Sequence, residues 1–215
     1  MTDMAGGNGT PGSPPAGERR SGTADDPAGP HSATEPVSPT LGWLLAVGGA
    51  VGLYASLVLT QDKIRLLADP TYVPTCSINA ILSCGRIIAT DQASVFGFPN
   101  PLIGIGAFSV LIALGVLRCG RVLLPRWVLA GVVIGSTLGG LFVSWLAYQS
   151  ILTIGALCPW CMVVWGMTVP ILGLSLRDLL ASGGPRLRPW QQACGWLVLL
   201  WFAVVLAGIL VRFYL

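Results

Sequence analysis

Long apolar runs without a charged residue alternate with short polar segments over most of this chain of 215 residues. The first run, residues 41–60, is twenty residues long. At about 1.5 Å per residue, a helix of that length crosses the hydrocarbon layer of a membrane. Further runs of similar length occur at 101–117, 127–148, 160–176 and 195–211. The pattern predicts an all-α integral membrane protein with five transmembrane helices.

The third and fourth helices come from a single stretch, residues 127–176, that carries no charge. Fifty residues are too many for one helix across a bilayer and enough for two. Polar residues and a glycine interrupt the stretch at 149–157, so the chain should turn there. A polar loop at 61–100 joins the first two helices and holds two cysteines.

Residues 1–39 differ from the rest because they contain seven glycines, seven prolines and no apolar run. Such a segment buries too little surface to offset the entropy lost on ordering. It also lacks the short apolar core that follows a basic start in a secretory signal. We expect a disordered tail without chemical function, followed by a transmembrane domain at 40–215.

The composition agrees with a membrane protein and argues against several classes of function. Hydrophobic residues make up 53% of the chain and charged residues only 10%, whereas a soluble domain carries about a quarter charged residues. The net charge of +3 is too small to indicate a nucleic-acid partner. The single histidine, His31, lies in the tail, which argues against a histidine-based metal site or a serine–histidine triad.

Basic residues predict the orientation, because cytoplasmic loops of membrane proteins carry an excess of Lys and Arg. With the N-terminus in the cytoplasm, eight of the 12 basic residues lie inside: Arg19, Arg20, Arg118, Arg121, Arg126, Arg177, Arg186 and Arg188. The other four lie outside: Lys63, Arg65, Arg86 and Arg212. This orientation puts the 61–100 loop and the 149–157 turn together on the outer face of the plasma membrane.

The same orientation divides the six cysteines between two compartments. The outer face holds Cys76, Cys84, Cys158 and Cys161, and the inner face holds Cys119 and Cys194. Disulfides persist outside the cytosol, whereas the cytosol keeps thiols reduced. We therefore expect redox chemistry from the outer four cysteines and none from the inner two.

Cys158 and Cys161 form a Cys-Pro-Trp-Cys motif at the start of the fourth predicted helix. There the leading thiolate faces unpaired backbone N–H groups and the positive end of the helix dipole, which lowers its pKa. Such a pair changes easily between dithiol and disulfide. Arg86, beside Cys84, either lowers the pKa of that thiol or is a solvated surface charge.

The outer cysteines allow three interpretations: two structural disulfides, a zinc site, or a relay that passes two electrons between pairs. Seven residues separate Cys76 from Cys84, whereas paired ligands of structural zinc are about two to four residues apart, so we expect no metal. In the relay, the outer loop meets a protein partner. The pair at the membrane surface meets a lipid-soluble acceptor of two electrons and two protons, which describes a quinone.

These residues also carry a family resemblance. Cys76 and Cys84 precede a Phe-Gly-Phe-Pro-Asn-Pro stretch at 96–101, and Cys-Pro-Trp-Cys follows at the head of the fourth helix. In this respect the chain resembles the bacterial branch of the vitamin K epoxide reductase family, whose members include DsbB-like thiol–quinone oxidoreductases. The resemblance covers about 41–176 and implies a four-helix transmembrane bundle, with the fifth helix added to it. In some relatives the fifth helix leads to a fused thioredoxin-like domain, and here we expect a separate protein instead.

The resemblance implies a role for each outer cysteine. Cys76 exchanges with the protein partner, Cys84 carries the electrons inward to Cys158, and Cys161 contacts the quinone. It also implies three residues of a quinone site, each of which has an ordinary structural alternative.

Asn100 matches the donor of a hydrogen bond to a quinone carbonyl, although an asparagine before Pro101 is also a common cap or turn residue at a helix start. Thr90 matches a Ser or Thr position near the loop pair. Trp165 stands where animal members have Tyr, and it is alternatively an interfacial aromatic residue. The Trp argues against a second carbonyl hydrogen bond of the same geometry and against turnover of the epoxide.

We therefore predict a thiol–quinone oxidoreductase that reoxidises a DsbA-like thioredoxin-fold partner and drives disulfide formation in exported proteins. The acceptor is a membrane quinone, with menaquinone favoured, acting as a substrate rather than a tightly bound cofactor. One alternative is a vitamin K epoxide or quinone reductase without a role in disulfide formation. Others are a conduit carrying reductant outward from the cytosol and a non-enzymatic scaffold with structural disulfides.

Overall fold

The computed structural model describes residues 39–181 and 184–215. The predicted tail at 1–39 lies outside the described residues except for Pro39. Within the described ranges the protein is helical and contains no β-strand. The β-type pairing there is an isolated bridge between Leu82 and Leu157. The prediction of an all-α protein is therefore confirmed.

Five helical stretches are long and apolar enough to cross a membrane, as the sequence predicts: Thr40–Ala68, Pro101–Cys119, Arg126–Ile154, Pro159–Ala181 and Arg188–Tyr214. The first joins α1 (Pro39–Trp43), a π-helical turn η1 (Leu44–Gly48) and α2 (Gly49–Ala68). The others are α4 (Pro101–Cys119), α5 (Arg126–Tyr148) with a π-helical extension η3 (Gln149–Ile154), α6 (Pro159–Ala181) and α7 (Arg188–Tyr214). Short helices α3 (Cys84–Ile88), η2 (Asp91–Ser94) and η4 (Pro185–Leu187) lie in the connections.

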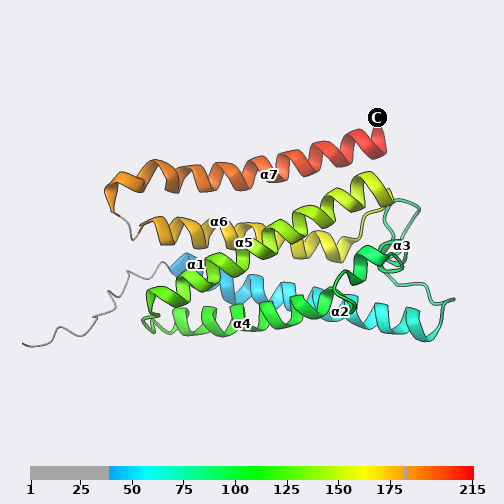
Figure 1. Ribbon diagram of the computed structural model, residues 1–215, viewed down its shortest axis with the longest axis horizontal. Helices are drawn as coiled ribbons and strands as arrows, with labels where there is room; N and C mark the ends of the chain where they lie inside the picture. The colour runs from blue at the N-terminus through cyan, green and yellow to red at the C-terminus, as the bar shows by residue number, and fades with distance from the viewer. Residues whose placement is uncertain (1–38, 182–183) are drawn as a thin grey trace, which may run out of the picture. The chain divides into compact units, whose positions relative to one another are not determined.

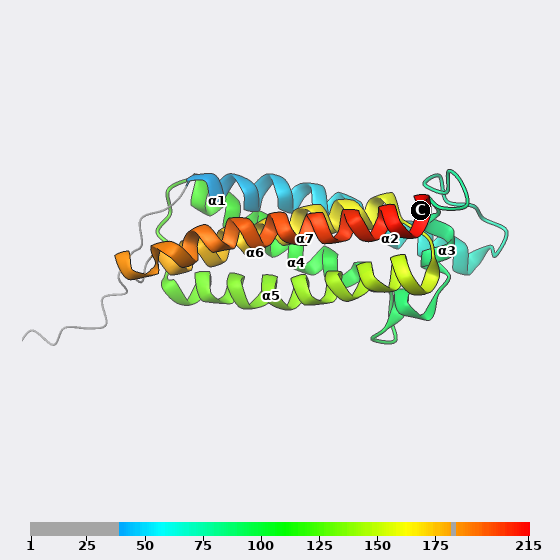
Figure 2. The same cartoon turned by 90° about the horizontal axis from the view of Figure 1, so that it is seen from above.

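Helices α2, α4, α5 and α6 form a four-helix bundle (Figures 1 and 2). Helix α2 packs against α4 and α6, and α5 also packs against α6. The fifth helix, α7, lies along α6. Its Trp201 donates a hydrogen bond from Nε1 to Ser144 Oγ on α5 at 2.9 Å, and it packs against the buried cluster that α5 and α6 form around Trp165. The fifth helix therefore packs against both α5 and α6 of the bundle.

Helix α4 comes closest to the first helical stretch at Gly115. A Cβ atom at this position would lie 2.3 Å from the backbone nitrogen of Ala46, a distance that real atoms do not adopt. Only a glycine lets the two backbones approach in this way, which is a common use of small residues between membrane helices.

Gly115→Ala is therefore expected to destabilise the protein by about 1–3 kcal/mol, because the new methyl group has to push one backbone away from another. The matched control is Gly106→Ala in the same helix, where an added Cβ meets no atom within 4 Å. That change should be neutral or stabilising by up to about 1 kcal/mol, since alanine favours the helix. Thermal unfolding of the purified proteins in detergent measures both effects, and equal midpoints for the two variants would contradict the close approach.

Two helix ends differ from the sequence prediction. The first helix ends at Ala68 rather than at residue 60, because polar groups in its last turns find partners inside the protein. Lys63 Nζ, for example, donates to the carbonyl of Ile88 at 2.6 Å. Helix α5 continues through η3 to Ile154, so the turn expected at 149–157 is confined to the residues after Ile154. Gly155, at φ 63°, makes that turn in the left-handed region that favours glycine.

Candidate redox site

Backbone pairing fastens the 61–100 loop to the turn before α6. Leu157 N–H donates to the carbonyl of Ile81 at 2.7 Å, and Ser83 N–H donates to the carbonyl of Leu157 at 2.9 Å. Cys84 and Cys158 directly follow these paired residues in the two segments. The pairing therefore brings two cysteines 74 residues apart in the sequence into contact.

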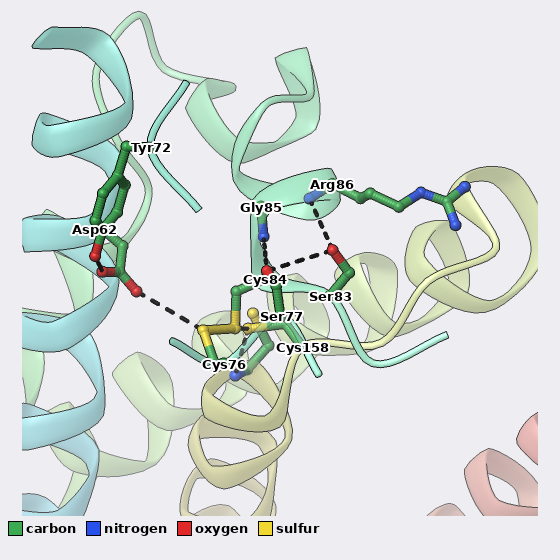
Figure 3. The surroundings of a disulfide bond; sticks show 10 residues. Asp62, Tyr72, Cys76, Ser77, Ser83, Cys84, Gly85, Arg86 and Cys158 are labelled. Carbon is green, nitrogen blue, oxygen red and sulfur yellow. Dashed lines mark hydrogen bonds between the residues drawn. A yellow bond between two sulfur atoms is a disulfide. The ribbon is translucent and has the colours of Figure 1, made fainter. Parts of the chain in front are cut away.

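Short-range polar contacts shape the loop so that it can make this pairing. Asn79 Oδ1 accepts hydrogen bonds from the N–H groups of Ile81 and Leu82, at 2.9 and 2.7 Å, which closes a turn. Ser83 caps α3 by accepting from Arg86 N–H, and Ser77 Oγ accepts from the N–H of the residue after Cys84 (Figure 3). The polar residues of this segment thus hold the Cys84 end of the loop in place.

Three cysteine sulfur atoms lie next to one another at this end of the bundle (Figure 3). Cys76 and Cys84 form a disulfide, and Cys84 Sγ lies 3.2 Å from Cys158 Sγ. Reacting atoms about 3–3.5 Å apart are close enough for direct attack. Cys84 and Cys158 are fully buried and Cys76 is 7% exposed. The arrangement permits thiol–disulfide exchange between the loop pair and Cys158 without a large movement.

The Cys-Pro-Trp-Cys motif lies at the start of a helix, as predicted. Pro159 is the first residue of α6, and Cys158 Sγ accepts a hydrogen bond from Cys161 N–H at 3.3 Å, in the manner of a helix-capping side chain. Trp160, between the two cysteines, packs edge-on against Tyr54 of α2 with ring centroids 5.5 Å apart. The motif is thereby anchored to the bundle.

This capping geometry affects the acidity of Cys158. A hydrogen bond from the Cys161 thiol, helped by the backbone N–H groups of Cys161 and Trp160, lowers the pKa of Cys158 below its ordinary value. Burial and the Asp62 carboxylate act in the opposite direction but do not prevail. A thiol with a lowered pKa is a good leaving group, so Cys158 is suited to departing from a disulfide with Cys84.

Two charged residues near the cysteines have contacts that the sequence did not reveal. Arg86 is exposed, but its guanidinium donates to the carbonyls of Ala80 and Ile154 at 2.8 and 3.3 Å, so it joins the loop to η3. Asp62, predicted to lie in the loop, is on α2 and buried, with Oδ2 3.7 Å from Cys76 Sγ. The sequence does contain a signal for this burial, because Asp62 falls on the same helix face as the buried residues Ala55 and Leu59 if the helix continues past residue 60.

A cavity of about 750 Å³ lies inside the bundle, bounded by α2, α4, α5 and α6 and by the 87–93 segment at the end nearest the cysteines. Its walls are mostly apolar. The wall contains Cys161 but neither Cys84 nor Cys158. Cavities of about 300–1,000 Å³ with few polar groups are typical binding sites for small apolar molecules. Of the four cysteines at this end of the bundle, Cys161 is thus the one that faces this space.

All three residues expected at a quinone site line the cavity. Asn100 is at the helix-capping position of α4, but its side chain does not cap that helix. Instead its Oδ1 accepts from Val95 N–H at 3.1 Å and its Nδ2 donates to the carbonyl of Gln92 at 2.6 Å. An amide nitrogen has two hydrogens, so a second donor is left for a ligand. Asn100 therefore does not cap α4 with its side chain. It holds the turn at 92–95 instead, which is the structural alternative to a role in ligand binding.

Thr90 and Trp165 contribute to the wall in different ways. Thr90 Oγ1 donates to the carbonyl of Ile87 at 2.7 Å, which ties it to the end of α3. Trp165 is buried and packs with Val143 and Val169, so it is part of the core rather than an interfacial aromatic residue. Both residues give the cavity a fixed shape at its redox end.

The two remaining cysteines lie away from this site. Cys119 is exposed at the end of α4 that points away from the loop, and Cys194 lies near the start of α7, where its thiol donates to the carbonyl of Trp190. Both are at the opposite end of the bundle from Cys158.

A disulfide and two thiols held at one end of a membrane-spanning bundle, next to an apolar cavity, define a membrane thiol–disulfide redox site. The family model of the vitamin K epoxide reductase family matches residues 43–176, more than half of the chain. The chain therefore belongs to the vitamin K epoxide reductase family and is a multi-pass membrane oxidoreductase. The match includes all four cysteines of the site and ends before α7. No curated protein matches the chain significantly.

Proposed function

We propose that the protein is a thiol–quinone oxidoreductase that reoxidises a DsbA-like thioredoxin-fold donor and reduces a membrane quinone. The observation that carries this proposal is the 3.2 Å separation of Cys84 Sγ and Cys158 Sγ, together with the position of Cys161 in the cavity wall. The net result is formation of disulfides in exported proteins. The quinone is a substrate, and menaquinone is the favoured acceptor.

In the first half of the cycle, a donor thiolate attacks Cys76 Sγ, and the electron pair of the broken bond leaves with Cys84. The second donor thiolate displaces Cys76, which releases the donor as a disulfide. The Cys84 thiolate then attacks Cys158 in a Cys158–Cys161 disulfide and frees Cys161. Each of these steps exchanges one S–S bond for another through a mixed disulfide.

In the second half, Cys76 attacks Cys84, restores their disulfide and expels Cys158. Both thiols of the Cys-Pro-Trp-Cys motif are then reduced, which is the bonding pattern described above. They give two electrons and two protons to the quinone and close their own disulfide. The lowered pKa of Cys158 favours its departure in the preceding step.

The quinone head group occupies the cavity beside Cys161 in this proposal. The remaining Nδ2 hydrogen of Asn100 binds one carbonyl oxygen, while Thr90 and Trp165 bound the ring. Trp165 carries an indole ring, so it does not offer the phenolic hydroxyl that a Tyr would. This favours quinone over vitamin K epoxide as the acceptor.

The proposed orientation puts the N-terminus in the cytoplasm, with residues 1–39 as a tail there, and the cysteines on the outer face. The distribution of basic residues supports it, since Arg118, Arg121 and Arg126 lie at the opposite end of the bundle from Cys158. On the outer side Cys76, 7% exposed, is the sulfur of the loop pair that a periplasmic or extracellular donor would reach, because Cys84 is fully buried.

The test is a coupled assay with purified protein, a pre-reduced DsbA-like donor and a soluble menaquinone analogue. We expect quinol to form at the rate at which the donor is oxidised, one quinol per donor disulfide, with Cys119→Ser as an active control. A second arm supplies vitamin K epoxide in place of quinone. Quinol formation with dithiothreitol but not with the protein donor would favour a quinone reductase without a role in disulfide formation.

A further inference from the structure

A buried carboxylate faces the loop disulfide. Figure 3 shows Asp62 on one side of the disulfide, next to Cys76, and Cys158 on the other side, next to Cys84. Asp62 is 4% exposed, and its Oδ2 lies 3.7 Å from Cys76 Sγ. Within the described part of the chain no ion pair neutralises it. Burial of an unpaired carboxylate is costly, so its position at a reactive sulfur calls for a function.

The carboxylate is held in a defined orientation. The hydroxyl of Tyr72 donates to Asp62 Oδ1 at 2.9 Å, and this hydroxyl in turn accepts from Arg65 at 3.4 Å. The Arg65 guanidinium also lies over the Tyr72 ring, 5.7 Å from its centroid. One carboxylate oxygen is thus engaged, and the other faces the sulfur.

We propose that the Asp62 carboxylate accepts the proton of the Cys76 thiol when this thiol attacks a disulfide, and returns the proton when Cys76 is the leaving group. This inference rests on the proposed role of Cys76 as the sulfur that exchanges with the protein donor. A thiol is a poor nucleophile until it loses its proton, and Asp62 is the carboxylate within reach of it.

The proton and the electrons balance in the internal exchange step. The Cys76 thiol attacks Cys84 in the Cys84–Cys158 disulfide, the new S–S bond joins Cys76 to Cys84, and the electron pair leaves with Cys158 as a thiolate. The proton of Cys76 goes to Asp62. When the donor later displaces Cys76, the departing sulfur takes the proton back from Asp62, and the carboxylate is restored for the next cycle.

The charged and titratable groups around this position are few. Arg65 and Tyr72 contact Asp62 or each other, and the charge of Asp62 also acts on Cys158. Lys63 points elsewhere, with Nζ on the carbonyl of Ile88, and Arg86 reaches Ala80 and Ile154. None of these groups offers a second proton acceptor to Cys76.

The test measures the reaction of Cys76 with bis(2-hydroxyethyl) disulfide in the full chain, in a Cys84→Ser background where Cys76 is the loop's single thiol. The probe is small and uncharged, so Asp62 does not attract or repel it. Peptide-resolved mass spectrometry reports the mixed disulfide on Cys76, and the exposed Cys119 is an internal reference. Because neither quinone nor a protein donor is present, the result is independent of whether the proposed function holds.

Asp62→Asn should slow this reaction by at least about tenfold at pH 7. The deficit should disappear above the ordinary thiol pKa of about 8.5, where Cys76 ionises without help. Asp62→Glu, which keeps a carboxylate, should retain more of the rate than Asp62→Asn. Asp69→Asn is the matched control, since Asp69 is exposed and binds Thr71 rather than a cysteine.

The opposite results would overturn the proposal. If Asp62 acted only through its negative charge, Asp62→Asn would stabilise the Cys76 thiolate and speed the reaction at pH 7. If it only supported the structure, the rate would fall by the same factor at every pH, and the Cys119 reference or the thermal midpoint would shift as well.

Discussion

Cys161→Ala should stop quinone reduction, with the turnover rate falling by about 1,000-fold or more. Cys161 is the cysteine in the cavity wall, and without it the Cys-Pro-Trp-Cys motif cannot close its own disulfide as it reduces the quinone. The loop disulfide is unaffected by the change, because Cys76 and Cys84 are joined to each other. The variant should therefore oxidise one equivalent of reduced donor and then stop.

The measurement is a donor-oxidation time course with and without quinone, followed by thiol counting. Cys194→Ala, at the other end of the bundle, is the matched control and should turn over normally. Sustained turnover by Cys161→Ala would contradict the assignment of this thiol to quinone reduction. A non-enzymatic scaffold with structural disulfides would give a different result, since neither the unmodified protein nor Cys161→Ala would reduce quinone.

Gly135→Leu should lower kcat/KM for quinone by about 100-fold, mainly through a higher KM. Helix α5 presents Gly131, Gly135 and Gly139 to the cavity, each four residues after the last, so a strip of this wall carries no side chains. A Cβ atom at Gly135 meets no atom within 4 Å, and a leucine side chain would extend into the space proposed for the quinone. Oxidation of the first equivalent of donor should be unchanged, since the sulfurs do not move.

The control for this prediction is Gly195→Leu on α7. Gly195 also has no atom within 4 Å of a new Cβ, but it is not part of the cavity wall. Its kcat/KM should stay within about twofold of the unmodified protein. A steady-state series of quinone concentrations separates KM from kcat, and equal losses in the two variants would show that the cavity is not the quinone site.

The five helices were predictable because a membrane span is recorded in the sequence as a run without charges. Helix α4 begins at Pro101 as predicted, since proline suits the first helical position. The ends were harder, because a helix that leaves the membrane continues with polar residues that resemble a loop. Helix α7, for example, begins at Arg188, seven residues before the predicted span at 195–211.

The sequence was enough to predict which cysteines gather at the candidate site, but not which atoms are in contact there. The predicted helices put Cys76, Cys84, Cys158 and Cys161 on one side of the membrane, and the structure has them at one end of the bundle. The contact between Cys84 and Cys158 depends on a backbone pairing between distant segments, which no local periodicity records. The buried position of Asp62 depends on the helix reaching beyond residue 60, so an error of two turns in one helix end concealed it.

Complete burial of Cys84 and Cys158 has a consequence for side reactions. Dissolved oxidants, glutathione and metal ions do not reach sulfur atoms that water does not touch. Electrons that pass between Cys84 and Cys158 are thereby shielded from molecules in solution. Only Cys76 and Cys161, at the two ends of the proposed relay, meet the donor and the quinone. An enzyme built in this way loses few reducing equivalents to unintended acceptors, even in a compartment rich in them.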